Sequence, residues 1–184
     1  TIGIYMSLAF LMPLGNFSVY MTSYIHYKQE FVTMHYGMFI NLIFSFANSL
    51  SHPLGGFFEN SLGFFKTIIL GSIITSISNI FFILQRNIWI CYLIAIFLGM
   101  GAGISTSLLG KNLIFYSPNK KGVISGILSF GVLIIVAIFA LGGEKIIAFK
   151  AHTIEDDEEF YPEEIAERIK IYLIIGEFFI PIGL

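Results

Sequence analysis

Residues 99–131 read GMGAGISTSLLGKNLIFYSPNKKGVISGILSFG, and this stretch decides the fold class of the chain. It contains a glycine-rich apolar segment, a short basic turn at 117–122 and a second apolar segment with further glycines. In water, each glycine inside a helix costs roughly 1 kcal/mol relative to alanine. In a lipid bilayer the same glycines let helix backbones approach closely, and close packing holds membrane helices together. The stretch therefore predicts a bundle of closely packed membrane helices, which is more typical of transporters than of enzymes.

The composition of the whole chain supports a membrane protein. Hydrophobic residues make up 56% of the 184 residues and charged residues 12%, and the mean hydropathy is +0.83. An ordinary soluble domain has about twice this proportion of charged residues. We therefore expect an integral, multi-pass membrane protein with the lipid bilayer as its surroundings. The net charge of -2 offers no basic surface, so we expect no nucleic-acid partner.

The chain contains six apolar segments, and a helix needs roughly 20 such residues to cross a bilayer. We expect membrane-spanning helices at 2–24, 36–58, 63–84, 89–115, 123–143 and 169–184. The sixth segment is short, and we expect it to be incomplete and the chain of 1–184 to be part of a longer protein. The sequence thus predicts an all-α membrane protein with a six-helix bundle.

The lysines near the helix ends predict the orientation of this bundle, because lysine and arginine collect on the cytoplasmic side of a membrane. Lys66, Lys111, Lys120 and Lys121 lie near the joints between the second and third and between the fourth and fifth helices. These joints are therefore expected to be cytoplasmic. The acidic connector at 144–168 then lies on the opposite, non-cytoplasmic side. Its acidic run lacks the spaced ligands and the glycine of a calcium loop, so we expect no metal site there.

Four polar residues of the second helix, Asn41, Ser45, Asn48 and His52, are separated by steps of four, three and four. These steps place them on one face of a helix. In hydrocarbon, a polar side chain must find a partner or face water. Two interpretations stay open: the face lines an aqueous cavity, or it forms hydrogen bonds between helices with no part in binding. For His52 itself, a structural role is favoured over a proton relay.

The first and the last apolar segments contain further polar residues. Asn16, Tyr20 and Ser23 share one face of the first segment, just after Pro13, which predicts a kinked helix with polar groups near its middle. Glu177 is the one acidic residue well inside an apolar run, and an acid in this position is a functional candidate by default. It is either a protonatable group for coupling or the partner of a polar group on a neighbouring helix.

The sequence contains no pairing of a nucleophile with a base and no cluster of metal ligands, so we expect neither an enzyme nor a bound cofactor. The glycines at 99, 101 and 103 form a GxGxG pattern without the preceding strand that a dinucleotide site needs. Gly99 and Gly103 share a smooth helix face with Thr106 and Gly110. We interpret this face as a packing surface.

Two stretches each have the spacing of a known sequence pattern. In residues 55–66, GGFFENSLGFFK, Gly56 and Gly63 match the glycines of a G-x-L-x-D-R-x-G-R-R loop, with Asn60 in place of the aspartate and Lys66 just beyond. The second stretch is similar to the pattern G-x-G-x-G … W-F-P-x-x-R-G-x-x-x-G-x-x-x-x-G. Its glycines are Gly99, Gly101, Gly103, Gly126 and Gly131, and Lys121 takes the place of the arginine. Together these stretches resemble the N-terminal six-helix half of the major facilitator superfamily, in particular its oxalate/formate antiporter-like and monocarboxylate porter group.

This resemblance implies one half of a twelve-helix secondary transporter that moves a small organic anion, a monocarboxylate or a dicarboxylate, by alternating access. The partner of the half would be the C-terminal half of the full-length chain, which in that group carries most of the cationic residues that bind the carboxylate. The residues expected to line the cavity are Asn16, Tyr20, Asn48, His52 and Ser105. The loop motif lacks its usual charges at 60, 61, 64 and 65. This loss favours the alternative, a transporter-like subunit or degenerate paralogue with a structural role in a membrane assembly.

Overall fold

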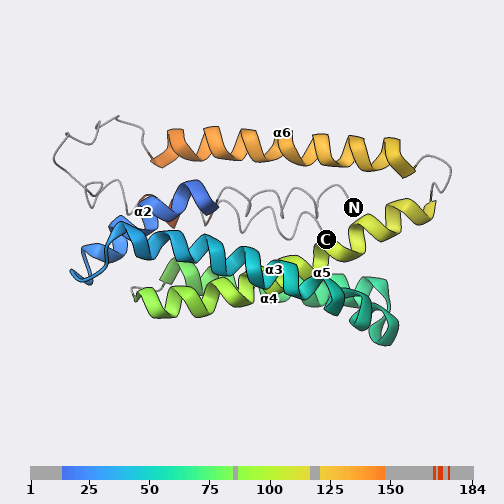
Figure 1. Cartoon of the computed structure of the whole chain (residues 1–184), viewed down its shortest axis with the longest axis horizontal. Coiled ribbons are helices and arrows are strands. Elements are labelled where there is room, and N and C mark those ends of the chain that lie inside the picture. The colour runs from blue at the N-terminus through green and yellow to red at the C-terminus, as the bar shows by residue number, and fades with distance from the viewer. Residues whose placement is uncertain are drawn as a thin grey trace.

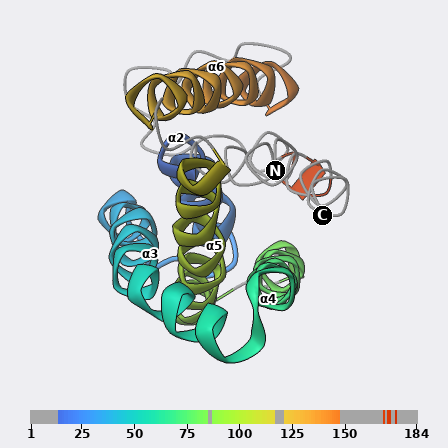
Figure 2. The same cartoon turned by 90° about the vertical axis from the view of Figure 1, so that its right-hand side faces the viewer.

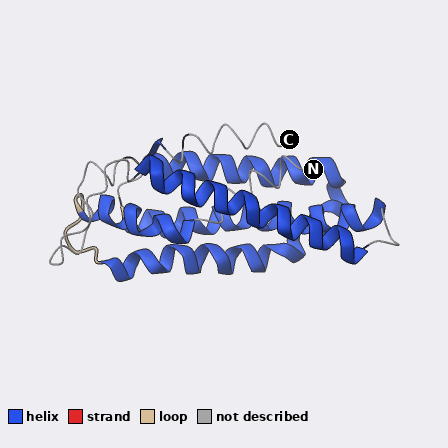
Figure 3. Cartoon of the chain, turned by 90° about the horizontal axis from the view of Figure 1, so that it is seen from above, coloured by secondary structure: helices blue, strands red, loops and turns tan. Residues whose placement is uncertain are grey.

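The computed structural model consists of helices and the turns between them (Figure 1). It describes residues 14–84, 87–116 and 121–147, together with Arg168, Lys170, Ile171 and Ile174. The helices are α2 (Leu14–His26), α3 (Met34–Leu62), α4 (Phe64–Leu84), α5 (Ile88–Tyr116) and α6 (Lys121–Ile147). No strand occurs in these described ranges (Figure 3). The prediction of an all-α chain is therefore confirmed.

Helix α5 is the centre of the bundle. Seen end-on in Figure 2, it stands between α3 and α4, and its contacts with these two helices are the most extensive in the structure. Helix α2 packs against α3. Helix α6 lies along one side of the bundle, beyond α2 (Figures 1 and 2). The residues of α5 thus determine how α3 and α4 are placed.

Four of the expected helices, at 36–58, 63–84, 89–115 and 123–143, correspond to α3, α4, α5 and α6. The first, at 2–24, overlaps α2, and residues 1–13 with Pro13 lie outside the described part. Nearly all of the 144–168 connector and of the sixth segment at 169–184 also lies outside it. The predicted kink at Pro13 and the role of Glu177 therefore stay predictions.

The joint between α3 and α4 differs from the expectation. The expected spans at 36–58 and 63–84 leave residues 59–62 between the two helices, but α3 continues to Leu62, and Gly63 alone separates it from α4. Gly63 has φ 83° and ψ 162°, a backbone conformation that essentially only glycine adopts. Its N–H donates to the carbonyl of Glu59 at 2.8 Å, and its own carbonyl accepts the Thr67 hydroxyl at 2.9 Å. The helix ends where glycine permits the turn, and the polar residues before it remain helical.

The bundle buries several small polar side chains beside its apolar core and exposes many large apolar side chains. The buried polar residues are Thr22, Ser23, Ser51, Thr67, Ser72, Thr75, Ser78, Asn79 and Ser105. Several of their hydroxyls donate to a carbonyl four residues earlier in the same helix, as Ser51 does to Ala47 at 2.7 Å and Thr75 to Gly71 at 2.9 Å. In contrast, Phe65 is 78% exposed and Met38 71% exposed.

Two helices of the described part, α4 and the Ile88–Leu108 portion of α5, are long and apolar enough to cross a membrane. Their outer faces, and those of α3 and α6, are covered with exposed large apolar residues. A soluble monomer rarely exposes contiguous apolar surface on this scale. The composition of the surface therefore supports an association with a membrane.

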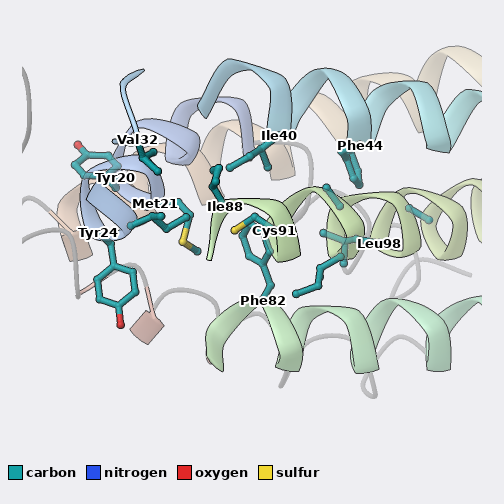
Figure 4. Close-up of a cluster of buried hydrophobic side chains, with 14 of the residues drawn as sticks. Tyr20, Met21, Tyr24, Val32, Ile40, Phe44, Phe82, Ile88, Cys91 and Leu98 are labelled. Atoms are coloured by element: carbon teal, nitrogen blue, oxygen red, sulfur yellow. The ribbon is translucent and has the colours of Figure 1, made fainter. Parts of the chain in front are cut away.

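A cluster of buried apolar side chains begins at the α2 end of the bundle (Figure 4) and continues along α5 to Ala102 and Leu108. It brings together Tyr20, Met21 and Tyr24 of α2, Ile40 and Phe44 of α3, Phe82 of α4, and Ile88, Cys91 and Leu98 of α5. Two polar contacts reinforce this end. The Ile88 N–H at the start of α5 donates to the Gln29 side-chain oxygen at 3.1 Å, and the Tyr92 hydroxyl donates to the Tyr36 carbonyl at 2.9 Å.

Candidate functional site

Gly99 and Gly103 bring α5 into direct backbone contact with α3. A Cβ atom on Gly99 would lie 2.5 Å from the Phe44 carbonyl oxygen and 2.9 Å from the Ala47 Cβ. A Cβ atom on Gly103 would lie 2.9 Å from the Ser51 Cβ. Real Cβ atoms essentially never approach other atoms to less than 3.0 Å. The two helices can therefore keep this distance only with glycine at both positions.

Gly101 faces α4, on a different side of α5 from Gly99 and Gly103. A Cβ atom there would lie 2.7 Å from the Gly71 carbonyl oxygen and 2.8 Å from the Thr75 nitrogen, both of α4. Positions four apart share a helix face, whereas positions two apart do not. The GxGxG pattern thus provides close contacts on two sides of α5 at once, one with α3 and one with α4.

Gly126 and Gly131 of α6, which were expected to be packing glycines, have different surroundings. A Cβ atom at either position would meet no atom within 4 Å in the described structure. The residues described here offer these two glycines no close packing partner, because α6 lies beside the bundle and not within it (Figure 2).

A hydrogen bond connects α3 and α5 beside the glycine contact. The Nε2 atom of His52 lies 3.2 Å from the Thr106 hydroxyl oxygen. The same oxygen lies 3.0 Å from the Ala102 carbonyl and 3.1 Å from the Gly103 carbonyl. His52 is exposed, while Thr106 is half-buried. This pair places an imidazole, fixed by a partner on another helix, at an accessible edge of the interface.

Asn48 lies one turn before His52 on α3. Its side-chain oxygen is buried and has no hydrogen-bond partner among the described residues. This oxygen would be 3.0 Å from a Cβ atom on Gly103, so the glycine leaves the room that the amide occupies. Asn48, His52 and Thr106 form one group, which we call the α3–α5 polar cluster. A buried acceptor without a partner is costly, and such groups in native structures call for an explanation.

Two of the other cavity candidates, Tyr20 and Ser105, lie outside this cluster. Tyr20 is 8% exposed and belongs to the buried apolar group at the end of the bundle (Figure 4). Ser105 is 2% exposed, donates to the Gly101 carbonyl at 3.0 Å and lies next to Gly71 of α4. It therefore faces the other side of α5. The backbone of Asn16 is part of α2, but its side chain lies outside the described part, as does Glu177.

The residues of the loop motif lie around the α3–α4 joint. Gly56 is half-buried within α3, and a Cβ atom there would meet nothing within 4 Å. Asn60 and Lys66 are exposed on the last turn of α3 and the first turn of α4. Gly63 forms the joint itself. The motif thus marks the turn at this end of the bundle.

Thr106 was assigned by its spacing to the packing face of Gly99 and Gly103, and its bond to His52 was missed. The two residues are 54 positions apart, and sequence periodicity does not reveal which helices are neighbours. The signal in the sequence was the three-residue step from Gly103 to Thr106, which places Thr106 on the side of α5 that faces the same neighbour as Gly103.

Two apolar grooves lie along the outside of α5. One, of about 410 Å³, is formed with α4, and the other, of about 460 Å³, with α3. Each contains a single serine, Ser78 or Ser51, and both hydroxyls already donate to their own helix. These grooves offer no polar group to an anion. Within the described residues there is also no group of three or more side chains that could hold a metal ion.

No family of known proteins, no curated protein and no solved structure matches this chain. The resemblance to the major facilitator superfamily therefore rests on the two motif stretches alone.

Proposed function

We propose that this chain is the N-terminal half of a secondary active membrane transporter, which moves a small organic anion by alternating access. The observation that carries the proposal is the α3–α5 polar cluster, set between closely packed helices of a bundle with an apolar exterior. Polar and ionisable groups inside a membrane are costly, and those that persist commonly line the path of a substrate. The predicted six-span topology and the twelve-helix full-length protein belong to this proposal.

The geometry of the cluster suits a binding face. His52 is exposed and held by Thr106, and the neighbouring Asn48 has a buried oxygen that the bundle itself does not pair. A site holds a solute best when its polar groups are already positioned and their desolvation has already occurred. Asn48 and His52 are therefore the side chains of this half that we expect to contact the solute, and the residues that neutralise its charge are expected in the C-terminal half.

The test is uptake by the full-length protein in proteoliposomes, measured with radiolabelled glycolate and lactate, two small monocarboxylates that also carry a hydroxyl group. Replacing Asn48 or His52 by leucine should lower uptake at least about tenfold, equivalent to about 1.4 kcal/mol, since each change removes a hydrogen bond to the solute. Ser61→Leu is the matched control, because Ser61 is an exposed serine of the same helix that lies away from the cluster. Unchanged uptake in both cluster variants would contradict the assignment.

A structural role in a membrane assembly is the second candidate. It is favoured by the cluster itself, in which the described side chains include neither lysine nor arginine to attract an anion. Wild-type protein that folds in proteoliposomes but moves neither acid, and that copurifies with other membrane proteins in fixed proportion, would support this role.

A further inference from the structure

The Thr106 hydroxyl group has one proton and three possible hydrogen-bond partners. Three atoms lie within hydrogen-bond distance: the Ala102 carbonyl at 3.0 Å, the Gly103 carbonyl at 3.1 Å and the His52 Nε2 at 3.2 Å. A hydroxyl donates one hydrogen bond and accepts others, while a carbonyl oxygen accepts only. The direction of the bond to His52 therefore depends on where the hydroxyl proton points.

The carbonyl groups are the favoured acceptors. They are the shorter contacts, and a threonine inside a helix commonly donates to the carbonyl three or four residues earlier. Several other hydroxyl groups of the described helices do the same; examples are Thr22, Ser51, Thr75, Ser78 and Ser105. When Thr106 donates to its own helix, its oxygen can only accept from His52, and Nε2 must then carry a proton.

We propose that Thr106 is a positioning residue that holds the neutral His52 ring in its Nε2–H form, so that Nδ1 accepts a hydrogen bond from the hydroxyl group of a solute. A neutral imidazole has one donor and one acceptor nitrogen. Because Thr106 uses the donor, only the acceptor is left on the exposed ring. This step rests on the proposed function, since it assumes that a solute reaches His52.

The kind of ligand that His52 binds follows from the single acceptor nitrogen left on its ring. A carboxylate has only acceptor atoms, so it gains no hydrogen bond from Nδ1 of the neutral ring. A hydroxyl group or an N–H group does. His52 therefore distinguishes a hydroxy acid from the corresponding unsubstituted acid, while the carboxylate of either is held by other side chains.

The tautomer is tested by nitrogen NMR of the full-length protein with isotopically labelled histidine, at about pH 9, where ordinary histidines are neutral. The His52 signals are identified by their loss in His52→Gln. We expect a protonated Nε2 in the wild type and in Thr106→Ser, which keeps the hydroxyl, and a mixture of tautomers in Thr106→Val. A wild-type ring protonated on Nδ1, or a Thr106→Val ring identical to wild type, would overturn the proposal.

The solute preference is tested in the same samples with glycolate and acetate, which differ by one hydroxyl group. The Nδ1 resonance of His52 should move on addition of glycolate and stay in place with acetate. Equal shifts, or no shift with either acid, would overturn the assigned ligand class. Uptake measured in parallel distinguishes a failure of the proposed transport function from a failure of the role of Thr106. If the wild type takes up neither acid but keeps its Nε2–H signal, transport is contradicted and the role of Thr106 is not.

Discussion

At the scale of single residues, three glycines of α5 allow the close contacts between helices. Gly99 and Gly103 face α3, and Gly101 faces α4, each where a Cβ atom would collide with a neighbouring backbone or side chain. Glycine in a helix interior is a poor choice for the isolated helix, so its presence here is justified by the contact. The sequence pattern was sufficient to identify these three residues as packing positions, but not to distinguish them from Gly126 and Gly131.

Gly103→Ala should lower the stability of the bundle. The added methyl group would lie 2.9 Å from the Ser51 Cβ and would also collide with the backbone of Asn48, so α3 and α5 must separate. Overpacking of this kind costs about 1–3 kcal/mol. The measurement is thermal unfolding in detergent micelles. Gly126→Ala is the control, since open space surrounds that position among the described residues and alanine favours a helix by up to about 1 kcal/mol. Equal effects of both substitutions would contradict the close contact.

At the scale of elements, the helices follow from apolar segment length, and their ends follow from local backbone chemistry. The ends of α4 and α5 agree closely with the expected ranges because apolar residues start and stop near them. The end of α3 does not, because Glu59, Asn60 and Ser61 fit into the last turn of a helix whose side chains are exposed or half-buried. The deciding residue is Gly63, whose positive φ ends the helix. A polar run shows where a helix can leave the apolar region, and a glycine of this kind shows where the helix stops.

Gly63→Ala should destabilise the joint between α3 and α4. Alanine in this backbone conformation is strained by about 1–3 kcal/mol, although the position has space for a methyl group. Gly56→Ala, in the same motif but within α3, should be neutral or slightly stabilising, because its surroundings are also open. Chemical unfolding of both variants is compared with the wild type. A Gly63→Ala protein as stable as Gly56→Ala would show that the joint does not need this conformation.

At the scale of the whole molecule, the described exterior is apolar, unlike that of a soluble protein, while the interior combines an apolar core with small polar side chains. Small hydroxyl residues lie between the helices, and isoleucine, leucine and phenylalanine cover the exterior. The composition alone predicted a membrane protein, but it could not predict which helices are neighbours. The contact of α5 with both α3 and α4, and hence the pairing of His52 with Thr106, depends on residues far apart in the sequence. The polar cluster was therefore predictable on the α3 side and not on the α5 side.

The most direct test of this account is a spin-label scan along α5 in a lipid bilayer. Cys91 is first replaced by alanine, and single cysteines are then labelled at successive positions from 89 to 98. The exposed positions, Trp89, Ile90, Leu93, Ile96 and Phe97, should be readily accessible to oxygen, which concentrates in lipid, while the buried positions Ile94, Ala95 and Leu98 should not. A water-soluble nickel complex should reach none of the positions from Leu93 to Leu98. If the exposed positions were instead more accessible to the nickel complex than to oxygen, the apolar exterior would not face lipid and the membrane assignment would be wrong.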